Sequence, residues 1–208
     1  MEKTKRNRVG GTGPKRDELK LFEKIGNISP GVIDELNSLL DDQPLRNDIN
    51  GDNYQISNNV DCQGVFGHGN SYRQILVQTN TGPENSVDEY DYSNWSFDLK
   101  IKEELSRYFK NVYRFRMSEM SGSSALNWHI DSCTSVMCRA QICLNENDSI
   151  FKFKGKDKQV YGFTMKPGEM WFINAARLHT VETGLKTRRV AVFGYHFDDL
   201  KNNDLLRV

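Results

Sequence analysis

From residue 112 onward the chain is a succession of short strand-like segments, and this pattern limits the fold more than any other feature. Each segment is rich in Val, Ile, Phe, Tyr or Cys, and Gly, Asn, Asp and Lys separate one segment from the next. The segments span residues 112–120, 136–144, 149–154, 159–165, 169–173, 179–183 and 188–197. Regularly spaced short strands of this kind predict a β-sandwich or barrel, and we expect a jelly-roll built by antiparallel pairing.

Two amphipathic helices are predicted ahead of these strands. Ser29-Pro30 precedes apolar residues at helical spacing, which indicates a helix with proline in its first turn that ends near residues 41–42. A second apolar pattern at helical spacing spans about residues 95–110. Residues 43–93 are rich in Asn, Asp, Gly and Ser and predict extended loops with a short strand near 72–77. The expected fold is therefore α+β, with a cupin-like double-stranded β-helix as its core and N-terminal helices packed on the sheet.

The length of the chain, 208 residues, favours one domain. Residues 1–20 are rich in Lys, Arg and Gly and predict a disordered basic tail, and residues 198–208 predict a polar C-terminal tail. The domain then spans residues 21–197, with its jelly-roll core at 112–197. Because 28 basic residues balance 28 acidic ones, the overall charge gives no support for a nucleic-acid partner.

Apolar runs and cysteines indicate the compartment. No uninterrupted apolar run approaches the roughly 18 residues of a membrane-spanning helix, and the N-terminus lacks the apolar segment of a signal peptide. We expect a cytoplasmic protein that does not enter a membrane. The cysteines at 62, 133, 138 and 143 form no CxxC pair, and residues five apart on a strand face opposite sides. We therefore expect reduced, buried thiols.

The segment Trp128-His129-Ile130-Asp131 carries the clearest chemical signal. His129 and Asp131 are two residues apart, so on an extended segment both side chains point to one side and reach a single ion. His179 follows a predicted strand and a turn. At this position it is able to join His129 and Asp131 as a third metal ligand. Two imidazoles and one carboxylate are the ligands of non-haem iron(II) oxygenases, which leave coordination positions open.

The alternatives to this metal site are weaker. A closed structural zinc site needs four ligands, commonly cysteines, and only Cys133 lies near His129 in the sequence. His68 lies between two glycines and His196 ends the last predicted strand, so we expect surface or core roles for both.

An arginine near the start of the last strand suggests an anionic co-substrate. Arg189 precedes the apolar run 190–195, where an inward arginine is costly unless it meets an anion. An arginine fork pairs bidentately with the distal carboxylate of a dicarboxylate such as 2-oxoglutarate, whose 2-oxo acid end chelates iron. Arg188 is the competing candidate, and its side chain is expected on the other side of the strand.

Residues 112–197 resemble the aspartyl/asparaginyl β-hydroxylase group of iron(II)/2-oxoglutarate dioxygenases, which includes free-proline hydroxylases. The pattern of that group has five ordered elements. Here they are His129-Ile130-Asp131, Arg139-Ala140-Gln141-Ile142-Cys143-Leu144, Pro167-Gly168-Glu169-Met170-Trp171, His179 and Arg189.

The resemblance implies roles for individual residues. His129, Asp131 and His179 match the iron ligands, and Arg189 matches the residue that holds the far carboxylate of 2-oxoglutarate. Ser118 and Arg139 match positions that assist co-substrate binding, and Gln141 is a further candidate for contact with the co-substrate. Two residues depart from the pattern: Gln141 replaces a common histidine, and Asn174 replaces an acidic residue. The presence of Asp131 favours hydroxylation over halogenation.

The substrate is expected to be an amino-acid side chain, free or within a polypeptide, with succinate and carbon dioxide as co-products. Trp128 is a candidate for contact with that substrate, although packing is an equally plain role for it. A nucleic-acid-modifying dioxygenase and a non-catalytic jelly-roll binding module are the two alternatives. Salt-dependent nucleic-acid binding would favour the first, and failure of iron(II) with 2-oxoglutarate to raise the melting temperature would favour the second.

Overall fold

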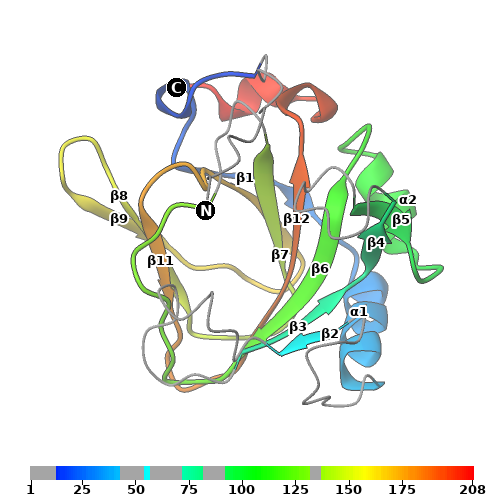
Figure 1. Ribbon diagram of the computed structural model, residues 1–208. Coiled ribbons are helices and arrows are strands. Elements are labelled where there is room, and N and C mark those ends of the chain that lie inside the picture. The colour runs from blue at the N-terminus through cyan, green and yellow to red at the C-terminus, as the bar shows by residue number, and fades with distance from the viewer. Residues whose placement is uncertain (1–12, 43–53, 57–71, 82–91, 132–136) are drawn as a thin grey trace, which may run out of the picture.

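The computed structural model describes residues 13–42, 54–56, 72–81, 92–131 and 137–208 (Figure 1). The helices and strands are η1 (Arg16–Glu18), β1 (Phe22–Asn27), α1 (Pro30–Asp42), β2 (Tyr54–Ile56), β3 (Tyr72–Leu76), β4 (Gln78–Asn80), β5 (Tyr92–Trp95), α2 (Ile101–Ser106), β6 (Tyr113–Met120), β7 (Cys138–Cys143), β8 (Ile150–Lys154), β9 (Val160–Phe163), β10 (Glu169–Ile173), β11 (His179–Glu182), β12 (Arg188–Tyr195), η4 (Phe197–Asp199) and η5 (Asn203–Leu206). Among these residues, no helix is long and apolar enough to cross a membrane.

Two antiparallel sheets form the body of the protein. Within the described ranges, the large sheet has seven strands in the order β1-β10-β7-β12-β6-β3-β2, and the small sheet has the order β11-β8-β9. In Figure 1 the small sheet faces one side of the large sheet. Aromatic rings fill the space between them, including Phe22 against Phe163 at 4.5 Å and Phe163 against Trp171 at 4.7 Å between ring centroids. The strands predicted from residue 112 onward are all present.

The opposite face of the large sheet, which we call the outer face, carries the main apolar core. Side chains of α1 and α2, such as Leu36 and Leu105, belong to one buried cluster with Met117, Ile142 and Phe193 of the sheet. Helix α1 has the predicted limits. The second helix is shorter than predicted and begins at Ile101, because residues 92–95 form β5 and pair with β4.

Both chain ends depart from the prediction of polar tails. Residues 13–20 are not a disordered tail: Leu19 is buried, and an isolated bridge pairs it with Arg207. Leu200 and Leu206, which lie in the predicted C-terminal tail, belong to the main core. The sequence suggested otherwise because these few apolar residues stand among charged ones. Residues 1–12 lie outside the described part of the chain, as does most of the predicted loop region 43–93.

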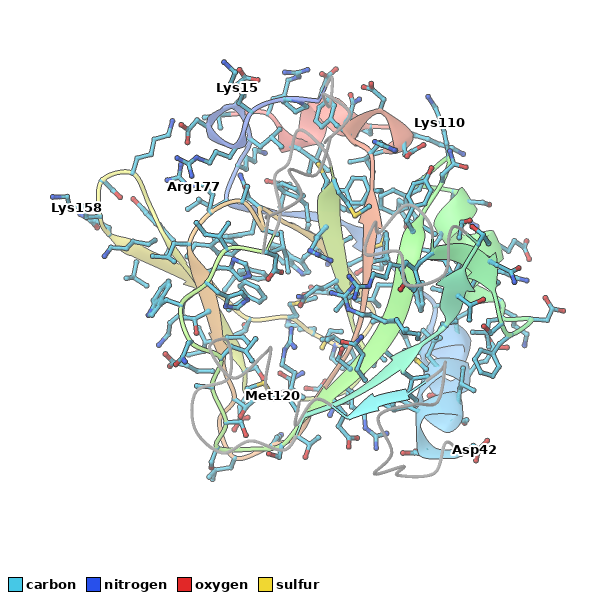
Figure 2. All side chains as sticks on the ribbon, viewed as in Figure 1. Lys15, Asp42, Lys110, Met120, Lys158 and Arg177 are labelled. Atoms are coloured by element: carbon cyan, nitrogen blue, oxygen red, sulfur yellow. The ribbon has the colours of Figure 1, made fainter. Side chains whose placement is uncertain are left out.

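The β8–β9 hairpin projects from the small sheet, and Lys158 at its tip has a positive φ of 67° (Figure 2). Figure 2 also shows Arg177 beside the N-terminal segment that carries Lys15, and Arg177 donates to Asp17 of that segment. That side of the molecule is where the N-terminal segment meets the small sheet.

Candidate metal centre

An irregular segment beside the small sheet places the two histidines opposite each other. Residues 125–131 run antiparallel to β11, with bridges between Ala125 and Glu182 and between His129 and His179. The His129 N–H donates to the His179 carbonyl at 2.9 Å, and the His179 N–H donates back at 3.0 Å. Their ring centroids are 4.4 Å apart as a result.

Asp131 lies on the same side as His129, as the i, i+2 spacing predicted. One carboxylate oxygen, Oδ1, is 3.2 Å from His129 Nε2, and the other, Oδ2, is 3.7 Å from His179 Nε2. The potential ligand atoms of the three residues all lie within 4.8 Å of one another. The structure therefore brings His129, Asp131 and His179 together into one potential metal-binding group.

Backbone carbonyls fix the orientation of both imidazole rings. His129 Nδ1 lies 2.6 Å from the Asn127 oxygen, and His179 Nδ1 lies 2.9 Å from the Arg177 oxygen. A carbonyl oxygen only accepts, so each Nδ1 carries the proton and each Nε2 faces Asp131. Metal-binding histidines usually have this arrangement, in which the distal nitrogen donates to a carbonyl or carboxylate.

The electrostatics of this group favour a bound cation. Burial by itself raises the pKa of the Asp131 carboxyl, but the hydrogen bond with His129 and the charge of Arg139 hold that pKa well below its usual range. Burial lowers the pKa of His179 and favours its neutral form. Burial also opposes protonation of His129, but Asp131 outweighs it and the pKa of His129 is raised. Asp131 thus stays ionised and attracts positive charge, either a proton on His129 or a metal ion.

Polar side chains continue from this group along the face of the large sheet that looks toward the small sheet, which we call the inner face. The buried Arg139 has its Nε 3.5 Å from Asp131 Oδ2. Gln141, two residues further along β7, accepts a hydrogen bond of 2.5 Å from Arg188 Nη2. Ser118 is buried and pairs in register with Val190, which shares the face of Arg188.

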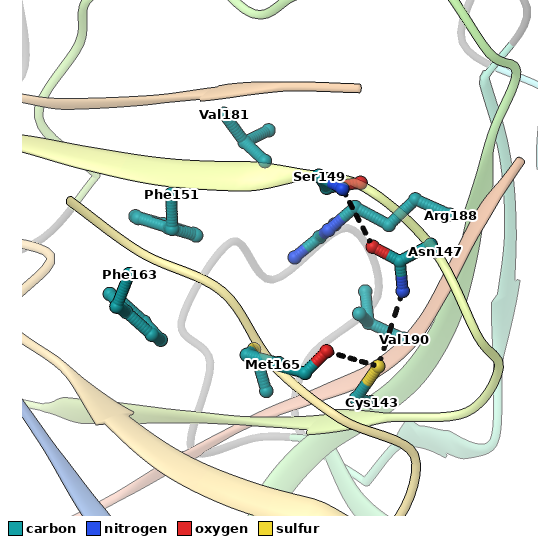
Figure 3. A pocket seen from close by; sticks show the side chains of 9 residues that line it. All are labelled: Cys143, Asn147, Ser149, Phe151, Phe163, Met165, Val181, Arg188 and Val190. Atoms are coloured by element: carbon teal, nitrogen blue, oxygen red, sulfur yellow. Dashed lines mark hydrogen bonds between the residues drawn. The ribbon is translucent and has the colours of Figure 1, made fainter. Parts of the chain in front are cut away.

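A small cavity surrounds Arg188 (Figure 3). Its free volume of about 10 Å³ leaves room for about one water molecule. Asn147 donates to the Cys143 sulfur at 3.3 Å and accepts from the Ser149 N–H at 3.1 Å on one side of this cavity. The lining residues are Cys143, Asn147, Ser149, Phe151, Phe163, Met165, Val181, Arg188 and Val190.

Arg189 does not point into this interior, and the expectation of an inward Arg189 is wrong. Its Nε donates to Glu119 at 2.7 Å and its Nη2 donates to Asp41 of α1 at 2.7 Å. The two carboxylates raise the pKa of Arg189 against the opposing effect of burial. The strand alternates, so Arg188 faces inward and Arg189 faces the helices. The anionic partners that the sequence required for Arg189 are these two carboxylates.

The other residues singled out in the sequence lie at the surface, in the core or outside the described residues. The Trp128 side chain is 42% exposed next to His129, so it does not pack in the core. His196 contacts the Tyr113 ring edge-on at 5.7 Å between centroids and lies outside the metal-binding group. Cys138 and Cys143 are buried thiols on opposite faces of β7. His68, Cys62 and Cys133 lie outside the described residues.

Two residues that line the cavity around Arg188, Asn147 and Ser149, were not predicted from the sequence. Both lie in a polar connection, Asn145-Glu146-Asn147-Asp148-Ser149, which has the composition of an ordinary turn. Only the three-dimensional structure, in which β7 belongs to the large sheet and β8 to the small sheet, shows that this connection lines the cavity.

No protein-family model matches the chain, and no curated protein sequence matches it. Solved structures do match. An oxidoreductase of the 2OG-Fe(II) oxygenase family from Burkholderia pseudomallei is 12% identical with a TM-score of 0.52, over 85% of this chain and 82% of that one. A prolyl hydroxylase from Trichoplax adhaerens was solved in complex with a peptide fragment of the hypoxia inducible factor oxygen degradation domain. It is 12% identical with a TM-score of 0.53, over 86% of this chain and 84% of that one.

HygX from Streptomyces hygroscopicus, solved with nickel and 2-oxoglutarate bound, is 12% identical with a TM-score of 0.51, over 86% of this chain and 84% of that one. Likeness at this level of identity shows the fold, which is the jelly-roll of these oxygenases. The chemistry has to be argued from the residues of this chain.

Proposed function

We propose that this protein is an iron(II)- and 2-oxoglutarate-dependent dioxygenase that hydroxylates an amino-acid side chain, either free or within a polypeptide. The observation that carries the proposal is the group of two Nε2 atoms and one ionised carboxylate, with both Nδ1 atoms held by carbonyls. Three protein ligands of these types fit iron(II) and leave positions open for other ligands. His129, Asp131 and His179 are the proposed ligands.

Arg188 is the proposed anchor for the far carboxylate of 2-oxoglutarate, in place of Arg189. Its side chain is 7% exposed and reaches along the inner face toward Gln141, on the strand that also carries Arg139. A buried guanidinium pairs strongly with a carboxylate. Because the free volume around Arg188 is small, the co-substrate would displace the Gln141 side chain from Arg188. Ser118 and Arg139 remain candidates for further contacts with it.

When bound, iron(II) with 2-oxoglutarate and dioxygen supplies oxidative decarboxylation to succinate and carbon dioxide, coupled to hydroxylation of a C–H bond. The residues of this chain hold the ligands in place, keep Asp131 ionised and shield the interior from water. The stacked aromatic side chains Phe151, Phe153 and Phe163 form an apolar wall of that interior. Trp128, exposed beside His129, is the proposed contact for the substrate.

The test is turnover of a panel of free amino acids and peptides by purified protein with iron(II), ascorbate, dioxygen and 2-oxoglutarate. We expect succinate above that of a His129→Ala control, together with the gain of one oxygen atom by one substrate in mass spectra. If wild-type protein and the His129→Ala variant give equal succinate with every substrate, the proposal is wrong. Salt-sensitive binding of DNA or RNA would instead favour a nucleic-acid substrate.

A further inference from the structure

One turn of the chain supports two of the three proposed metal ligands. The turn Asn174–Arg177 connects β10 to the segment that begins β11. Its Ala175 carbonyl accepts the Asp131 N–H at 2.9 Å, and its Arg177 carbonyl accepts His179 Nδ1–H at 2.9 Å. Any shift of this turn therefore moves the backbone of Asp131 and rotates the ring of His179.

The side chain of Asn174 ties this turn to the N-terminal segment Arg16–Leu21, which we call the strap. Asn174 is completely buried, and its Nδ2 donates to the Arg16 carbonyl at 2.9 Å and to the Lys20 carbonyl at 3.0 Å. Its own backbone N–H donates to the Leu21 carbonyl at 3.0 Å. A carboxylate at this position would face two carbonyl oxygens without a proton to donate, which explains why an amide occupies it.

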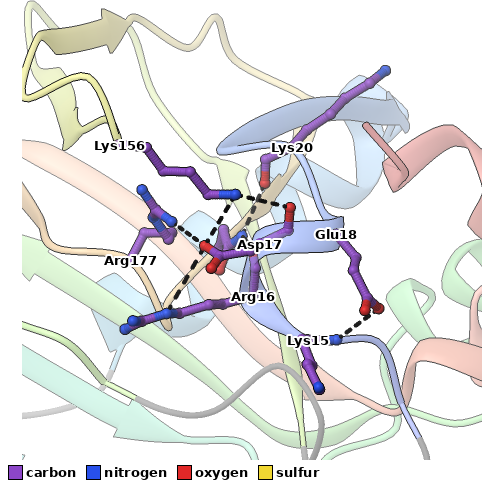
Figure 4. Close-up of polar contacts among 8 residues, drawn as sticks. Lys15, Arg16, Asp17, Glu18, Lys20, Lys156 and Arg177 are labelled. Atoms are coloured by element: carbon purple, nitrogen blue, oxygen red, sulfur yellow. Dashed lines mark hydrogen bonds and ion pairs between the residues drawn. The ribbon is translucent and has the colours of Figure 1, made fainter.

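An ion pair joins the strap to the other end of the turn (Figure 4). The Arg177 guanidinium donates to Asp17, and the Arg177 side chain is only 11% exposed. Lys156 of the β8–β9 hairpin lies 3.6 Å from the same carboxylate. Asp17 thus connects the turn with the strap and with the hairpin that follows β8.

The strap is itself firmly held. Leu19 is buried and bridges to Arg207, and the Lys20 N–H donates to the Leu206 carbonyl at 2.9 Å. Directly after the strap, β1 pairs with β10, the strand that leads into the turn. The strap is therefore a fixed support on which the turn rests.

We propose that Asn174 and Asp17 are positioning residues for the metal centre, which they hold through the turn Asn174–Arg177. The inference rests on the proposed function, because it concerns the geometry of that same metal site. Neighbours that orient metal ligands typically contribute 10- to 100-fold to metal affinity.

The experiment compares metal affinity with folding stability in four variants. Asn174→Ala removes both hydrogen bonds of the side-chain amide. Asp17→Asn removes the negative charge of the ion pair, and Asp17→Glu keeps that charge. Asn37→Ala is the matched control. The side-chain amide of Asn37 also donates a hydrogen bond to a backbone carbonyl, that of Leu144 at 2.7 Å, but this bond lies on the outer face. Cobalt(II) binding is followed by its visible absorption, anaerobic iron(II) binding by calorimetry, and stability by urea unfolding of the metal-free proteins.

We expect Asn174→Ala to weaken cobalt(II) and iron(II) binding by about tenfold and to change the cobalt(II) spectrum. Asp17→Asn should weaken binding by a smaller factor, and Asp17→Glu should restore it. Asn37→Ala should lower stability and leave affinity and spectrum unchanged. If Asn174→Ala fails to fold, the half-exposed Asp17 still decides the matter through its two variants.

The outcomes separate the two proposals. If wild-type protein binds neither metal, the proposed function is wrong and this inference is wrong with it. If wild-type protein binds metal and Asp17→Asn and Asn174→Ala bind equally tightly with the same spectrum, the proposed function stands. In that case the strap serves only stability, and the positioning inference is overturned.

Discussion

The two faces of the large sheet differ in a way that separates folding from chemistry. The outer face meets α1 and α2 with apolar side chains such as Phe115, Met117 and Phe193. The inner face carries buried polar side chains, among them Arg139 and Arg188. Burying a charge is costly unless polar neighbours surround it, and here Arg139 lies beside Asp131 while Arg188 donates to Gln141. In the proposed function the inner face binds a cation and an anion, whereas the outer face packs against the helices.

Arg188 and Arg189 illustrate the contrast, because they are adjacent in the chain and serve opposite faces. Arg188 reaches Gln141 in the interior, whereas Arg189 ties α1 to the sheet through Asp41 and Glu119.

Loss of a large side chain from the outer face should have the largest effect on stability. Phe193 is completely buried and lies 5.2 Å from Phe109 and 5.8 Å from Phe115 between ring centroids. We expect Phe193→Ala to lower the free energy of unfolding by about 3–5 kcal/mol, because it leaves a cavity. Urea unfolding measures this loss. If folded Phe193→Ala protein also binds cobalt(II) more weakly than wild-type protein, packing on the outer face influences the metal centre and the two faces do not act separately.

Removal of Arg189 should have a smaller effect. Its ion pairs are partly exposed, and pairs of this kind contribute little each. We expect Arg189→Met to lower the free energy of unfolding by about 1 kcal/mol, measured by the same urea titration. A loss as large as that of Phe193→Ala would show that the link between α1 and the sheet is electrostatic and not apolar.

The smallest effect should appear as a pH dependence at the edge of the inner face. Burial raises the pKa of Glu169, but hydrogen bonds from the Lys166 N–H, Lys24 and Trp171 outweigh it and lower that pKa. A carboxyl whose folded pKa is lowered contributes stability above its unfolded pKa, and this contribution disappears as the pH falls through the folded pKa. Glu169→Gln should therefore flatten stability between about pH 5 and pH 3, measured by thermal unfolding across that range. An unchanged acid profile would contradict this assignment.

The amino-acid sequence predicted much of the fold correctly. The limits of α1 and the strands from residue 113 onward follow from apolar periodicity and turn residues, which are local signals. Strand β1 and the C-terminal turns were missed because their stability comes from pairing with distant residues, such as Phe22 with Ile173. The shortened α2 has the same cause, since Trp95 is taken up by pairing with Gln78.

The candidate site was less completely predictable. The spacing of His129 and Asp131 indicated one shared side, and the structure places His179 beside them. The assignment of an inward arginine failed because residues 190–193 are apolar on both faces of β12, so the sequence does not show which alternate residue points inward. The roles of Asn174 and Asp17 depend on contacts more than 150 positions apart in the chain.

The most direct test of the central claim is the affinity for 2-oxoglutarate, measured with iron(II) under anaerobic conditions for wild-type protein, Arg188→Met and Arg189→Met. Loss of a charged hydrogen-bonding partner corresponds to about 1.5–3 kcal/mol, which is roughly 10- to 100-fold in affinity. The account predicts this loss for Arg188→Met and a change within about twofold for Arg189→Met. Equal affinities for wild-type protein and Arg188→Met, or a loss confined to Arg189→Met, would contradict it.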